Sequence, residues 1–171
     1  MPRTLDPRDP CYIDNPARVK AIQREMRKQG LDVYLGSRIR TLTWTLDAFI
    51  PWRSYVFIPA EGLPTLFTFV IDATRLADES WLDEDHVRAY APMGGMDQIS
   101  AVSDFIRDEL RLRKGRLGYE DGMATYTAEG NLTHYEYTRF KEALDGFEFI
   151  NAHEIVDSLS IIKDPGTINR F

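Results

Sequence analysis

The chain has 171 residues, 43% hydrophobic and 28% charged, which suits one globular domain with its own core and argues against disorder. Its formal charge is −6, and acidic residues are interleaved with the basic ones, so nucleic acid is not an expected partner. The single cysteine, Cys11, excludes an intramolecular disulfide. Because the sequence has neither an apolar leader nor a run of about 18 apolar residues, we expect a cytoplasmic protein without a membrane partner.

The N-terminal third begins with a proline-rich segment, residues 1–13, that predicts an irregular arm. Asp14-Asn15-Pro16 then predicts the start of a helix over 15–29, which Gly30 ends. A short β-rich run, 31–35, follows. Residues 37–50 alternate threonine with leucine and tryptophan, a pattern that favours a strand, although a helical turn after Ser37 is an alternative.

The next two apolar runs predict strands at Arg53–Pro59 and Thr65–Ile71. The link between them is rich in proline and glycine, so we expect an antiparallel hairpin. The remaining expected elements are a helix at 74–82, a strand at 87–90, a break at 93–96, a helix at 98–113, a strand at 116–120, a helix at 128–144, a strand at 147–150, a helical turn at 155–159 and a break at 163–166. This order predicts an α/β fold, with helices on both faces of a mixed sheet.

Polar clusters are few, and none has the spacing of an active site. Asp83–His86 concentrates three carboxylates and an imidazole, but four adjacent residues cannot all converge on one ion, so a polar loop is expected. His134 and His153 lack the H-E-x-x-H spacing of a zinc site. Glu120 and Asp121 follow a strand, where either a catalytic pair or an Asp-Gly turn is possible. The sequence therefore predicts no catalytic residue and no metal or other cofactor in this chain.

Four segments in the same order resemble the N-terminal domain of the creatinase, prolidase and aminopeptidase P family. They are residues 24–35 (REMRKQGLDVYL), 53–67 (RSYVFIPAEGLPTLF), 117–120 (LGYE) and 155–165 (IVDSLSIIKDP). The last is similar to the family's interdomain junction. Thr43–Phe49 departs from the family's "NI-x-YLTGF"-like segment, Ser160 stands where arginine is usual and Thr167 where glutamate is common. The subfamily and its substrate, peptide or creatine-like amidine, therefore stay open.

The resemblance implies a three-layer α/β/α domain with a mixed sheet and a ribonuclease-H-like motif. It places an arm at 1–13, the domain at 14–162 and the start of a linker at 163–171. Family members carry catalysis in a C-terminal "pita-bread" domain, with two divalent metal ions such as manganese in the peptidases. The expected partners are accordingly this chain's own C-terminal catalytic domain and a second copy in a homodimer, with the present domain covering the active site. The alternative is a free-standing α/β binding or scaffold protein of the same fold.

Arg53 and Trp52 are the only candidate substrate-contact residues. In creatinase-like members an arginine at the start of the hairpin reaches the substrate, and Arg53 matches that position, with Trp52 beside it. A guanidinium can bind a carboxylate through two hydrogen bonds, and an indole can form an apolar wall. The other interpretation is a surface arginine stacked on Trp52 or Tyr55. A substrate role predicts that Arg53 is partly exposed and free of a buried carboxylate, and that its loss lowers kcat/KM but not Tm.

Overall fold

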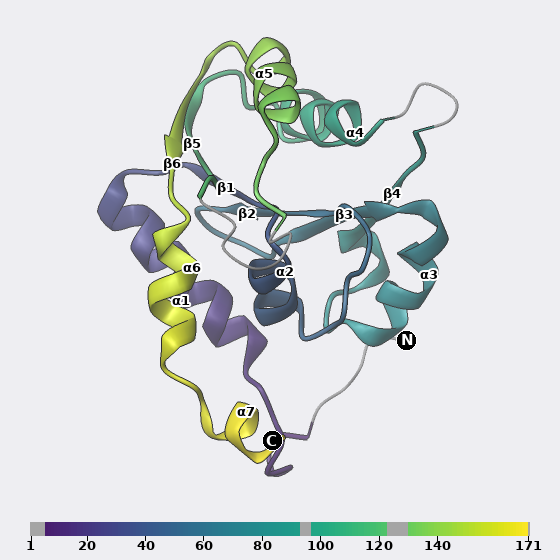
Figure 1. Cartoon of the computed structure of the whole chain (residues 1–171), viewed down its shortest axis with the longest axis vertical. Helices are drawn as coiled ribbons and strands as arrows, with labels where there is room; N and C mark the ends of the chain where they lie inside the picture. The colour runs from purple at the N-terminus through teal and green to yellow at the C-terminus, as the bar shows by residue number, and fades with distance from the viewer. Residues whose placement is uncertain (1–5, 93–96, 123–129, 171) are drawn as a thin grey trace.

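The computed structural model describes residues 6–92, 97–122 and 130–170. Within them a six-stranded sheet has the strand order β4-β3-β2-β1-β5-β6 (Figure 1). The strands are β1 (Val33–Gly36), β2 (Tyr55–Pro59), β3 (Thr65–Phe69), β4 (Val87–Tyr90), β5 (Gly115–Tyr119) and β6 (Phe147–Asn151). The helices are α1 (Asn15–Gln29), α2 (Ile39–Leu46), α3 (Val70–Glu79), α4 (Gln98–Asp104), α5 (His134–Ala143), α6 (Glu154–Ile161) and α7 (Pro165–Asn169), with a 3-10 turn at Glu84–His86 and a π-helical turn at Phe105–Glu109.

Local signals define the first helix as predicted. The side chain of Asp14 accepts a hydrogen bond from the backbone N–H of Ala17, which satisfies one of the unpaired donors at the start of α1. Gly30 ends the helix with φ of 65°, a left-handed conformation that glycine adopts without strain. The prediction of a helix over 15–29 is confirmed.

The sheet is mixed, and its centre is the predicted hairpin. β2 pairs antiparallel with β3 and with β1, whereas β3–β4, β1–β5 and β5–β6 are parallel. The hairpin strands are shorter than predicted, because β2 begins at Tyr55 and Val70 already starts α3.

Helices cover both faces of the sheet. On one face, α1, α2, α3 and α6 pack on a core that includes Ile22, Leu42, Leu76 and Val156. On the other face, α4, its π-helical continuation and α5 pack on a second core (Figure 1). The predicted three-layer α/β/α fold with a mixed sheet is confirmed.

Residues 37–50 correct the preferred prediction, because they form helix α2 instead of a strand. Its buried residues are Thr41, Leu42, Thr45 and Leu46, which are spaced by four residues as one face of a helix requires. The threonine–leucine alternation was therefore misleading. The alternative of a helical turn after Ser37 describes this segment better.

Other boundaries differ for local reasons. The helix from Gln98 ends by 109, and Arg111 lies in the left-handed region with φ of 56°. α5 begins at His134, because Thr133 and Glu136 form a capping box. The expected break at 163–166 contains the start of α7, where the Asp164 side chain accepts from Thr167 N at 2.8 Å. The expected break at 93–96 lies outside the described residues, as do the first residues expected in helix 128–144.

Candidate functional site

Arg53 lies just before β2, and its guanidinium faces α5. Its Nε donates to Glu136 Oε1 at 2.7 Å and its Nη2 to Glu136 Oε2 at 2.6 Å, a bidentate ion pair. Nη1 also donates to the Gly130 carbonyl at 2.5 Å, and Nη2 to that of Asn131 at 3.2 Å. The side chain of Arg53 is 25% exposed and that of Glu136 only 7%. The arginine thus links the start of β2 to the start of α5.

Two tyrosines complete this cluster. The Tyr55 hydroxyl donates to Glu136 Oε1 at 2.6 Å, and the Tyr90 hydroxyl donates to the Arg53 carbonyl. Burial would raise the pKa of Glu136, but the hydrogen bonds from Tyr55 and Arg53 outweigh it and leave that pKa below its usual value. Burial raises the pKa of Tyr90 to about 12 and that of Tyr55 further still. The cluster is therefore a stable ionic anchor within the domain.

This geometry corrects the expectation of a free guanidinium. Arg53 is partly exposed, as predicted, but it is paired with a buried carboxylate of its own domain. Trp52 points elsewhere: it is 50% exposed and packs edge-on against Phe69 with ring centroids 5.7 Å apart. The two residues are neighbours in sequence but have different surroundings. A contact of either with a substrate stays a prediction.

Several large apolar side chains on α3 and in the loop before β2 are exposed. Phe49 is 66% exposed, Trp52 50%, Val70 49% and Ile71 68%. Arg75 Nη2 donates to the Phe49 carbonyl at 3.0 Å, which holds the loop before β2 against α3. We call Phe49, Trp52, Val70 and Ile71 the α3 face. Sequence reasoning missed it, because residues 70 and 71 were expected inside the hairpin.

Glu120 is fully buried directly after β5 and accepts four hydrogen bonds. Its Oε2 accepts from the backbone N–H groups of Ser37 at 2.6 Å and Arg38 at 2.8 Å. Its Oε1 accepts from the Tyr34 hydroxyl at 2.8 Å and from that of Thr41. Burial raises the pKa of Glu120, and these hydrogen bonds oppose the shift only in part. The carboxylate fastens α2 to the sheet and has no oxygen left for a substrate.

The other polar clusters remain apart. Asp83–His86 includes a 3-10 turn in which His86 Nδ1 lies 3.4 Å from Thr65 Oγ1, and Asp121 is exposed. His134 starts α5, while His153 contacts Asn151. In the described part of the chain, no three histidine, cysteine, aspartate or glutamate side chains are placed to hold a metal ion.

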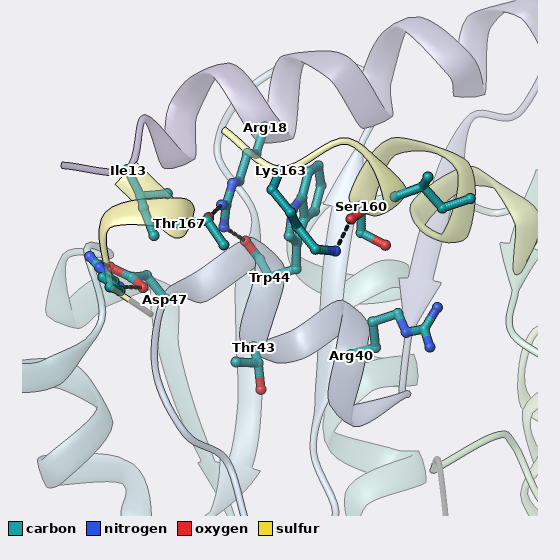
Figure 2. A pocket seen from close by; sticks show the side chains of 11 residues that line it. Ile13, Arg18, Arg40, Thr43, Trp44, Asp47, Ser160, Lys163 and Thr167 are labelled. Atoms are coloured by element: carbon teal, nitrogen blue, oxygen red, sulfur yellow. Dashed lines mark hydrogen bonds and ion pairs between the residues drawn. The ribbon is translucent and has the colours of Figure 1, made fainter. Parts of the chain in front are cut away.

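The C-terminal helices are joined to α1 by Arg18. Its Nε donates to Asp164 Oδ2 at 3.0 Å, its Nη2 to Thr167 Oγ1 at 2.7 Å and its Nη1 to the Trp44 carbonyl at 2.7 Å. These contacts border a cavity of about 540 Å³ between α1, α2 and the α6–α7 segment (Figure 2). It is lined by Ile13, Arg18, Arg40, Thr43, Trp44, Asp47, Ser160, Ile161, Lys163, Thr167 and Arg170.

Several solved peptidase structures share this fold. A proline dipeptidase from Streptococcus pneumoniae has a TM-score of 0.68 and 17% identity, over 85% of this chain and 98% of that one. An Xaa-Pro dipeptidase from Bacillus anthracis has a TM-score of 0.68 and 20% identity, over 91% of this chain and 38% of that one. The N-terminal domain of the cytoplasmic peptidase PepQ from Mycobacterium tuberculosis H37Rv has a TM-score of 0.58 and 17% identity, over 84% of this chain and 98% of that one. At these identities the likeness concerns the fold.

The chain spans nearly all of the pneumococcal chain but well under half of the Bacillus enzyme. A search of curated protein sequences finds no match. No helix within the described ranges is long and apolar enough to cross a membrane. The Creatinase/Prolidase N-terminal domain family matches residues 18–162, which is most of the sequence. The chain belongs to the Creatinase/Prolidase N-terminal domain family.

Proposed function

We propose that this chain works as the non-catalytic N-terminal domain of a cytoplasmic Xaa-Pro peptidase-like hydrolase. In this proposal it pairs with a second copy and covers the active site of a C-terminal catalytic domain. That domain would supply the two divalent metal ions of a peptidase. Family membership supports the assignment, and so does the presence of several Xaa-Pro and proline dipeptidases among the structural neighbours. The substrate class stays open between peptides and creatine-like amidines.

The α3 face is the observation that carries the proposal. Four large apolar side chains are each about half exposed or more, although the same sheet buries two complete cores. Large exposed apolar side chains that gather near one helix of a folded domain often mark a contact with another protein surface. Trp52 then contributes to the covered active site, while Arg53 fixes the loop through Glu136.

The double variant Phe49→Lys/Ile71→Lys, made in the complete hydrolase, tests this assignment. Both side chains point to solvent here, so the variant should keep its circular dichroism and Tm. Loss of the apolar contact should convert a dimer to a monomer in sedimentation velocity and lower kcat/KM at least about tenfold.

The matched control is Leu63→Lys, in the hairpin turn, where the leucine is 44% exposed but lies outside the α3 face. This variant should stay dimeric in sedimentation velocity and keep its kcat/KM. A double variant that stays dimeric and fully active would contradict the proposal and favour a free-standing binding or scaffold protein.

A further inference from the structure

The cavity beside the C-terminal helices has the size of a small-molecule site. Its volume, about 540 Å³, lies within the range of about 300–1,000 Å³ that is typical of ligand pockets. Its lining includes the apolar side chains of Ile13, Trp44 and Ile161, four cationic side chains and the carboxylate of Asp47. The proposed function does not involve this cavity.

The cationic side chains of the cavity differ in how fully carboxylates pair with them. Arg18 is bound to Asp164, and Arg170 forms an ion pair with Asp47. Both of these cations are therefore largely neutralised by fixed partners.

Arg40 and Lys163 differ from those two. Arg40 is 52% exposed and, among the described residues, forms an ion pair only with Asp157 Oδ1, at 3.2 Å, on a carboxylate that also pairs with Arg38. Lys163 donates to the Ser160 carbonyl and forms no ion pair with any residue of the described ranges. Figure 2 shows Lys163 extending from the α6–α7 segment past Trp44 towards α2, the helix that carries Arg40. On a chain with a net charge of −6, the cavity is thus a local positive site.

The apolar wall restricts which anion fits. The Trp44 ring is held in place, because the Arg18 guanidinium lies over it at 4.9 Å. Ile161 is 73% exposed and also lines the cavity. A bare inorganic anion would leave this apolar surface wet, whereas an apolar body attached to the anion would cover it.

We propose that this cavity binds a small carboxylate with an aromatic or aliphatic body. Lys163 and Arg40 bind the carboxylate, and Trp44 with Ile161 contacts the body. Thr43 also lines the cavity. None of the cavity residues belongs to the α3 face.

Calorimetry on the 171-residue chain tests the proposal with three probes: 3-phenylpropionate, its neutral amide and inorganic phosphate. The carboxylate should bind one to one with a dissociation constant of about 1 mM or tighter, as expected for about eleven non-hydrogen atoms. The amide and phosphate should each bind at least about tenfold more weakly. Added salt should lower the affinity for the carboxylate. Equal binding of the amide, or tighter binding of phosphate, would overturn the proposal.

Variants assign the residues. Lys163→Ala and Arg40→Ala should each lower the affinity for 3-phenylpropionate at least about fivefold, since each variant loses one charged donor. Lys20→Ala, an exposed lysine on α1 outside the cavity, is the matched control and should change nothing. In a 1H–15N NMR titration the Trp44 indole N–H should shift with the same dissociation constant. Unchanged affinity in Lys163→Ala, or shifts confined to other parts of the domain, would also overturn the proposal.

Discussion

Glu120 and Glu136 are both buried glutamates, but their surroundings shift their pKa values in opposite directions. Among the described residues, no cationic group binds Glu120, so the loss of hydration dominates and its pKa is raised. Glu136 is bound by Arg53 as well as by Tyr55, so its pKa is lowered. The two residues should therefore contribute to stability with opposite pH dependence.

For Glu120, the folded state retains a proton at pH values where the unfolded state has lost it. Stability should therefore fall as pH rises from the usual glutamate pKa of 4.5 through the raised folded value. Glu120→Gln should remove this slope, since the Gln carbonyl can accept from the two backbone N–H groups and its amide can donate to the hydroxyls of Tyr34 and Thr41. Urea unfolding of both proteins at about pH 4 to about pH 8 measures the pH dependence of their free energies of unfolding.

Glu120→Ala is the contrasting variant. It leaves the buried N–H groups of Ser37 and Arg38 without an acceptor and should lower the free energy of unfolding by about 3 kcal/mol or more. An alanine variant as stable as the glutamine variant would show that the carboxylate does not hold α2 to the sheet.

The ion pair of Arg53 reverses the stability effect expected from sequence. Arg53→Ala leaves Glu136 buried without its cation, so the free energy of unfolding should fall by about 2–4 kcal/mol and Tm with it. Because the folded pKa of Glu136 is lowered, the contribution of the pair is present above pH 4.5, the usual pKa of glutamate, and is lost as pH falls through the folded value.

The control for that variant is Arg88→Ala. Arg88 pairs with Glu109, but the two side chains are 42% and 51% exposed, so the change should stay within about 0.5 kcal/mol. Equal effects of the two substitutions would refute a structural role for Arg53.

At the scale of elements, the structure separates what short-range signals can predict from what they cannot. The hairpin, α1 and the strand at 87–90 follow from caps, turns and periodicity within a few residues. α2 does not, because Thr41 is bound by Glu120, which lies 79 residues further along the chain. The same limit applies to the candidate site: Arg53 and Trp52 could be picked out, but Glu136, 83 residues from Arg53, could not be assigned as its partner.

The position of α7 depends on one glycine. A Cβ added at Gly166 would lie 1.8 Å from the Tyr12 carbonyl oxygen, so the backbone would have to move. Gly166→Ala should detach α7 from the N-terminal arm and weaken the hydrogen bonds of Arg18. Hydrogen exchange should quicken at 10–18 and 164–170, with about 1–3 kcal/mol lost in overall stability.

Gly122→Ala is the comparison variant, because among the described residues its added Cβ would meet only Asn131 Oδ1, at 3.9 Å. It should leave exchange at both segments unchanged. Unaltered exchange in Gly166→Ala would mean that α7 does not need this close approach.

At the scale of the whole molecule, the two buried glutamates, Glu120 and Glu136, are both engaged in contacts within the domain. Since no trio of ligating side chains occurs in the described ranges, the 171-residue chain should bind manganese, cobalt or zinc no more tightly than about micromolar. It should also leave Xaa-Pro dipeptides intact. Calorimetry with each metal, followed by an assay with metal present, measures both. A saturable stoichiometric site, or turnover that chelation abolishes, would contradict this expectation.

The strand order also has a consequence for synthesis on the ribosome. β1 to β4 lie side by side in the order in which they emerge, whereas β5 and β6 add later, beyond β1. Until residues 115–119 appear, the outer edge of β1 is an unpaired strand edge of the kind that aggregates or recruits chaperones. Nascent chains stalled when residue 112 has just cleared the exit tunnel should therefore be captured by general chaperones. Release of that capture once residue 151 has cleared the exit tunnel would mark the closing of the sheet.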